Sequence, residues 1–190
     1  MDVPRLDPTR FEPHYSTITS ADQVQIYEAI LGDTDGRVTT TLLRAARYLK
    51  DNRILPTGFA KAGAPPDIAV RGDAAKDGDF AGGGDAVLYR VDVAGGVAPF
   101  AVTAELLYQS IGYRWADNLR RYRAPEIERF SSYYQAVSNL PVCVATASAR
   151  VPRERREAGG PPRRSLRSIW CGWYWVGCDE ARRVSCHEPE

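Results

Sequence analysis

Two alternating runs lie next to each other between Asp85 and Asn118, and they constrain the fold more than any other stretch of the chain. Residues 86–93 and 100–109 each place apolar or aromatic side chains at every second position, which is the pattern of a half-buried strand. Glycines at 95 and 96, followed by Pro99, supply a reversal between them. The stretch predicts a long β-hairpin, which needs further strands to cover its apolar face.

Shorter patterns predict the remaining elements. Further strands are expected at 22–31, before the turn 32–36, at 68–70 as a short edge strand, and at 142–151 after Pro141. Apolar residues at helical spacing predict short helices over 42–50 and 125–137, and the aromatic stretch 112–119 suits a strand end or a bend. We expect the helix at 125–137 to pack an apolar stripe against the core.

These elements predict a mainly β fold with a minor α+β character. We interpret residues 1–151 as one incomplete β-sandwich-like domain with two short helices, in which 1–20 is an extended N-terminal segment. Cys143 is expected to be a small core residue. The glycines at 82–84 are interpreted as a flexible entry to the hairpin.

The sequence changes character after Val151. Residues 152–190 follow neither a period of two nor one of 3.6, and they contain three of the four tryptophans and three of the four cysteines among many Arg, Gly and Pro residues. A GC-rich gene read in the wrong frame gives such a composition. We expect a disordered or non-native tail, with a genuine disordered Arg-rich extension as the alternative.

Charge and hydropathy exclude several classes of protein. The chain has 25 Lys and Arg against 24 Asp and Glu, so it has no basic footprint for nucleic acid and no polybasic membrane anchor. No apolar run approaches the roughly twenty residues that span a bilayer. The N-terminal residues lack the features of a signal peptide, which predicts a cytoplasmic location for the chain as written.

The residues predict no catalytic group and no metal site. The cysteine spacing fits neither a redox pair nor a zinc site, and Cys186-His187 would need a cysteine at the position of Arg183 to attach haem. His14 is the one candidate cofactor contact, as an axial ligand or neighbour of a haem edge, with a structural loop histidine as the alternative. A separate set is a possible surface contact that could stack a sugar or a base: Tyr113, Arg114 and Trp115.

The blocks QVQIYE and KDNRILPTGF, together with DIAVRGDAAKDGDFAGGGDAVLYRVDV and PFAVTAELLYQSIGYRWADNL, extend over roughly residues 7–151. This region resembles the C-terminal region of bacterial exported multihaem c-type cytochromes. The resemblance implies a non-catalytic accessory domain that supports electron transfer by packing against the haem-bearing part or by docking a redox partner. It also implies a periplasmic or exported location, and haem c only in a parent or partner protein.

In that family the haem motifs and the first strands of the β-rich domain lie upstream of the region that this chain resembles. We therefore expect an unpaired sheet edge or an exposed apolar face, which would also permit self-association. Two other functions stay open, namely a stand-alone ligand- or carbohydrate-binding β-sandwich module and a small hydrolase. An enzyme is not expected, because no titratable groups converge in the sequence.

Overall fold

The structure, a computed structural model, describes residues 9–93, 96–152 and the strand 180–187. Strands outweigh helices, which confirms the prediction of a mainly β fold. The strands are β1 (Thr17–Ile18), β2 (Ile26–Tyr27), β3 (Ala29–Gly32), β4 (Val38–Thr39), β5 (Arg47–Asp51), β6 (Leu88–Tyr89), β7 (Phe100–Tyr108), β8 (Val142–Val151) and β9 (Glu180–His187). The α-helices are α1 (Tyr113–Leu119) and α2 (Pro125–Ala136).

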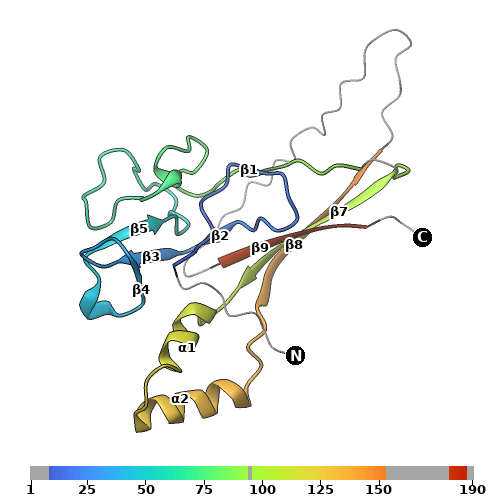
Figure 1. The fold of residues 1–190 in the computed structure, drawn as a ribbon. Helices are drawn as coiled ribbons and strands as arrows, with labels where there is room; N and C mark the ends of the chain where they lie inside the picture. Colours follow the sequence, from blue (N-terminus) through green and yellow to red (C-terminus); the bar gives the residue numbers. More distant parts are fainter. Residues whose placement is uncertain (1–8, 94–95, 153–179, 188–190) are drawn as a thin grey trace, which may run out of the picture.

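The described strands form three small sheets. The largest has the order β2-β9-β7-β8, the second has the order β4-β3-β5, and β1 pairs with β6. Figure 1 shows β7, β8 and β9 side by side as a long ribbon, with α1 and α2 beyond one end of it and the β3-β4-β5 sheet to one side.

The predicted hairpin is wrong, because its two arms pair with other strands. β6 pairs in parallel with β1, whereas β7 pairs antiparallel with β8 along its whole length and with β9 on its other side. Val91 and Val93 are exposed where the first arm leaves its sheet. Alternation in a sequence records which side chains are buried, but it does not record which strand lies alongside.

The helix predicted at 42–50 is also wrong. A single 3₁₀ turn spans Leu42–Arg44, with Leu43 99% exposed, and β5 follows it. β5 pairs with β3 antiparallel, so sheet pairing overrides the local helical spacing. The strand predicted at 22–31 is broken into β2 and β3 at Glu28, and in place of the strand predicted at 68–70 there is one isolated bridge from Asp51 to Arg71.

The second predicted helix is confirmed as α2, with Pro125 in its first turn and two glutamates close behind. None of its residues is buried, so its apolar stripe does not enter the core, and Val137 is exposed. α1 occupies the stretch that was predicted to be a strand end or a bend. Within the described ranges no helix is long and apolar enough to cross a membrane.

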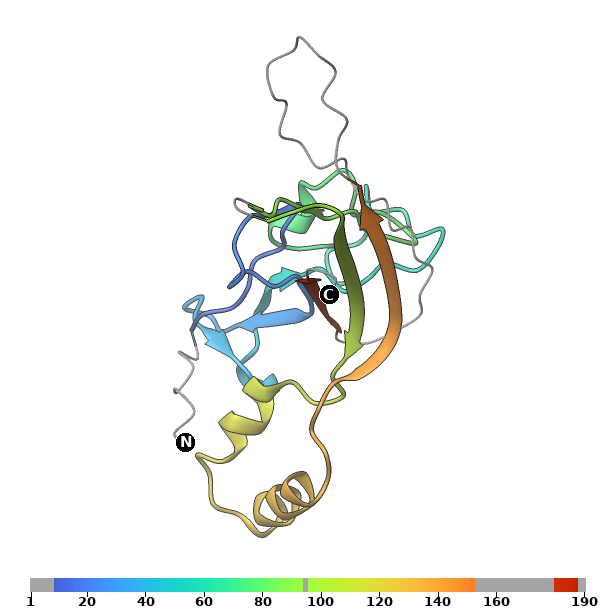
Figure 2. The same ribbon diagram turned by 90° about the vertical axis from the view of Figure 1, so that its right-hand side faces the viewer.

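β8 is confirmed as a strand and forms one border of its sheet among the described strands. Most of its residues are exposed, including Cys143, so the prediction that Cys143 is a core residue is wrong. In Figure 2, β8 lies on the outer side of β7.

The division at residue 151 is corrected in one respect. Glu180–His187 form β9, which pairs with β2 on one side and β7 on the other, so this part of the predicted tail belongs to the sheet. The prediction for the rest of the tail concerns residues that lie outside the described ranges, apart from Pro152.

The apolar core is small and lies beside the loops between β5 and β6. Its buried members are Tyr27, Leu55, Val70, Ala74 and Phe80. The glycines at 82–84 fit these loops closely: a Cβ on Gly82 would lie 2.7 Å from the Phe59 carbonyl oxygen, and Gly83 has a φ of +95°. The glycines therefore serve close backbone approach in a bridged turn, not a flexible entry to a hairpin.

Candidate functional site

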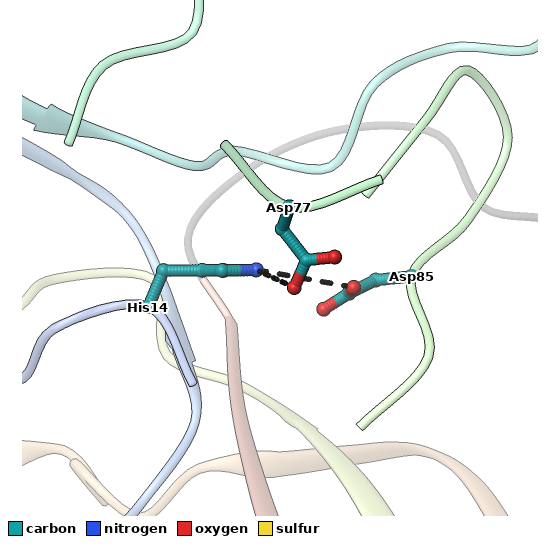
Figure 3. Close-up of side chains that lie close together, drawn as sticks. All are labelled: His14, Asp77 and Asp85. Carbon is teal, nitrogen blue, oxygen red and sulfur yellow. Dashed lines mark hydrogen bonds and ion pairs between the residues drawn. The ribbon is translucent and has the colours of Figure 1, made fainter. Parts of the chain in front are cut away.

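His14 lies at the centre of a buried cluster of polar side chains. Gln25 enters from the residue before β2, Asn52 from the residue after β5, and Asp77 and Asp85 from two loops between β5 and β6. Figure 3 shows the ring of His14 with its edge toward the two carboxylates. Segments far apart in the sequence thus converge on one histidine.

The backbone fixes the orientation of both amides. Gln25 Oε1 accepts the Tyr15 N–H at 2.8 Å, and Asn52 Oδ1 accepts the Glu28 N–H at 2.9 Å. Both NH₂ groups consequently face His14 Nδ1, at 2.9 Å from Gln25 Nε2 and 3.1 Å from Asn52 Nδ2. Because Nδ1 accepts these hydrogen bonds, it carries no proton, and the neutral imidazole holds its proton on Nε2.

The Nε2 proton of His14 faces two carboxylates. Nε2 lies 3.2 Å from Asp77 Oδ2 and 3.9 Å from Asp85 Oδ1. The side chain of His14 is 1% exposed, and those of Asp77 and Asp85 are 9% and 0% exposed. Two carboxylates beside a neutral imidazole leave an excess of buried negative charge, which is costly unless a cation or a proton compensates it.

The two oxygens of Asp85 differ in their surroundings. Oδ2 accepts the Tyr27 hydroxyl at 2.5 Å and Gln25 Nε2 at 3.3 Å. Oδ1 is buried and has no hydrogen-bond partner. Buried carboxylate oxygens nearly always have a hydrogen-bond donor or an ion beside them. Asp85 Oδ1 has no such donor within hydrogen-bond distance among the described residues.

Lys61 holds the loop that carries Asp77. Its Nζ donates to the backbone carbonyls of Ala74 and Phe80, each at 2.9 Å, and to that of Asp77. The other oxygen of the Asp77 carboxylate, Oδ1, accepts the Asp79 N–H at 2.9 Å. Hydrogen bonds from an ammonium group are stronger than neutral ones, so the carboxylate sits on a firmly positioned loop.

A surface hollow of about 350 Å³ opens over the Asp77 carboxylate. It is lined by His14, Ser16, Asp73, Lys76, Asp77 and Gly78. The side chain of Lys76 is 86% exposed, and its ammonium lies 4.0 Å from Asp73, so its charge stays in solvent. Water and small ions can therefore reach Asp77 from the hollow.

Aromatic rings form the inner wall of the cluster. The Phe80 ring is fully buried, with its centroid 5.1 Å from that of His14, and it stacks on Tyr27 at 6.4 Å. Such apolar walls strengthen the electrostatic interactions of the polar groups beside them.

Lys50 of β5 is hydrogen-bonded to β2 and to one residue on either side of it in the sequence. Its side chain is buried, and its Nζ donates to the carbonyls of Glu12 and Ile26 at 2.8 Å and to Glu28 Oε1 at 3.4 Å. Burial lowers the pKa of Lys50, and the neighbouring Glu28 carboxylate opposes this shift.

The possible surface contact lies apart from the cluster, at the start of α1. Tyr113 and Trp115 are 41% and 36% exposed, and the Arg114 guanidinium donates to the Arg10 carbonyl. Residues two apart on a helix do not face each other, so the two rings do not form one flat stacking platform. The guanidinium of Arg120 lies 6.0 Å from the Tyr113 ring centroid.

The sequence identified His14 but not its partners. Gln25, Asn52, Asp77 and Asp85 stand 11, 38, 63 and 71 residues further along the chain, and no motif of fixed spacing connects them. The assignment of His14 as a haem contact stays a prediction, and in this structure its ring faces Asp77 and Asp85.

Comparison with known proteins gives no relative for this arrangement. No protein family, no curated protein and no solved structure matches the chain, so the resemblance to multihaem cytochromes rests on the sequence blocks alone.

Proposed function

We propose that this chain is a non-catalytic accessory domain that docks onto another protein through the outer edge of β8. The resemblance of the sequence suggests the class of partner, namely the haem-bearing segment of a multihaem c-type cytochrome or its redox partner. An incomplete β-sandwich and a periplasmic or exported location are parts of the same proposal.

The observation that carries the proposal is the character of β8. Among the described strands it pairs with β7 alone, and its other edge presents the backbone N–H and C=O groups of a ten-residue strand. Natural edge strands are usually protected by lysine, proline or a bulge that turns the edge away. In β8 the single charged residue is Arg150, and Val142 and Val144 are exposed. The register with β7 shifts at Val144, so the regular part of the open edge is residues 145–151. Such an edge is suited to adding a strand from a partner.

The hydrogen bonding of His14 supports a non-catalytic role. Its Nδ1 lone pair is taken by the amides of Gln25 and Asn52, so this nitrogen offers no general base to the hollow.

Binding to a purified multihaem c-type cytochrome, measured by calorimetry with the full chain, tests the proposal. The single variants Val144→Lys and Thr146→Lys are each expected to weaken binding at least about tenfold, because a charged edge resists strand addition. Leu43→Lys is the matched control, since it adds the same charge at an exposed side chain outside this sheet. Absence of binding, or equal weakening by the control, would reject the proposal.

The same β8 variants also test whether two copies of the chain associate with each other. A concentration-dependent dimer in sedimentation experiments that the β8 lysines abolish would identify a second copy of the chain as the occupant of the edge.

A stand-alone ligand- or carbohydrate-binding module is the second candidate, favoured by the exposed rings of Tyr113 and Trp115. Trp115→Ala should then abolish binding to an oligosaccharide array, while Tyr133→Ala, which removes an exposed ring of α2, should not. An array without any bound sugar would exclude this candidate.

A further inference from the structure

We propose that His14, Asp77 and Asp85 bind one divalent metal ion of the class that accepts mixed imidazole and carboxylate ligands, such as Mn²⁺. This site is independent of the docking edge, because it lies among the loops between β5 and β6 and beside β2.

The spacing of the three side chains fits an ion. One ligand atom from each lies within 4.8 Å of the others, with separations of 3.2 and 3.9 Å from His14 Nε2 to the two aspartates. A point equidistant from three atoms with these separations lies about 2.0–2.4 Å from each, which is the range of metal–nitrogen and metal–oxygen bonds for divalent cations. No large rearrangement of the loops is needed.

A second observation points to a ligand at the same place. Asp85 Oδ1 is fully buried and has no hydrogen-bond partner, and it lies on the side of the carboxylate that faces His14 Nε2. A divalent ion there would give this oxygen the interaction partner that it lacks, and it would neutralise the charge of both carboxylates. The hollow over Asp77 provides an entry path and room for water ligands.

The proton on His14 must move when the ion binds. The Nε2–H bond breaks, the Nε2–metal bond forms, and the proton transfers to Nδ1. An Nδ1–H would meet the NH₂ groups of both Gln25 and Asn52, so in the ion-bound state both amides turn and present Oε1 and Oδ1 to the ring. The Tyr15 and Glu28 N–H groups then lose these acceptors, and metal binding must offset that cost. The net charge of the three ligands and the ion then changes from −2 to 0.

Electron paramagnetic resonance of free Mn²⁺ in titrations of the full chain tests the site. The wild-type chain should bind one Mn²⁺ below about 1 mM free ion, the weak limit of oxygen-ligand cation sites. Asp77→Asn preserves an acceptor for His14 and should weaken binding about 100-fold or more, since even outer-shell partners contribute 10–100-fold. Asp79→Asn is the matched control: it makes the same change on the same loop, at an exposed carboxylate, and should leave binding unchanged.

Pulsed resonance of the bound Mn²⁺ gives a second readout that requires no change in the cluster. Coupling to an imidazole nitrogen is expected, and it should persist in His187→Gln, which removes the second histidine of the chain. Absence of Mn²⁺ binding would overturn the proposal. Binding without nitrogen coupling, or binding that Asp77→Asn and Asp79→Asn weaken equally, would also overturn it.

Discussion

Replacing Lys61 with methionine tests how far the loop around Asp77 depends on one ammonium group. Methionine keeps an unbranched apolar chain beside the Phe80 ring, whose centroid lies 5.7 Å from Nζ, but it removes three hydrogen bonds to backbone carbonyls. Hydrogen bonds that involve a charged group contribute about 1.5–3 kcal/mol each, and three bonds from one ammonium share a single desolvation cost. We expect the free energy of unfolding to fall by about 2–4 kcal/mol.

Urea unfolding followed by circular dichroism measures this change. Lys76→Met is the control, because it makes the same substitution at an exposed side chain nearby and should change stability by less than about 0.5 kcal/mol. If the two variants lose equal stability, the three carbonyl contacts do not stabilise the loop and the reasoning is refuted.

Three further perturbations probe separate features of the fold. Tyr27→Phe removes the donor to a buried carboxylate and should lower the free energy of unfolding by about 2 kcal/mol in urea, whereas Tyr133→Phe, at an exposed ring, should have no effect; equal stability of the two variants would contradict this. Gly82→Ala should lower stability by about 1–3 kcal/mol in thermal melts, because the added Cβ would meet backbone atoms. Gly78→Ala adds a Cβ with nothing within 4 Å and should be tolerated, so equal melting temperatures of the two variants would rule this out. Burial, together with a hydrogen bond to the Glu12 carboxylate, raises the pKa of Tyr15 from 10.0 to about 12. The contribution of the neutral Tyr15 side chain to the free energy of unfolding is therefore intact below pH 10 and is lost as the pH rises toward 12. The fall in the urea midpoint between about pH 9 and about pH 11 should therefore be smaller in Tyr15→Phe, and an equal fall would argue against the shift.

The strands could be predicted from sequence better than their partners. The alternating run at 142–151 became β8 with the expected bounds, and the run at 100–109 became β7 within one residue. Their pairing could not be read from the pattern, because any strand with a matching apolar face can occupy a given position. β6 pairs with β1 instead of β7. The helical spacing at 42–50 did not produce a helix, because β5 pairs with β3 over part of this stretch.

Of the residues in the buried cluster, only His14 could be predicted from the sequence. His14 was noticeable because histidine is rare in this chain. Its carboxylate neighbours were not, since Asp77 stands in a loop rich in aspartate, and nothing local distinguishes Asp85 from the others. The amides of Gln25 and Asn52 define the tautomer of the ring, yet amide side chains carry no sequence signal for such a role.

The position of β9 sets the order in which the chain can fold during synthesis. β9 is the last described strand in the sequence, but it lies inside the sheet, between β2 and β7. While a ribosome is still producing the residues before Glu180, one edge of β7 has no partner in this sheet, and β2 has none either. The largest sheet therefore closes only after residues 180–187 have left the ribosome. Such long-range pairing slows folding and leaves nascent strand edges open to chaperones or to aggregation.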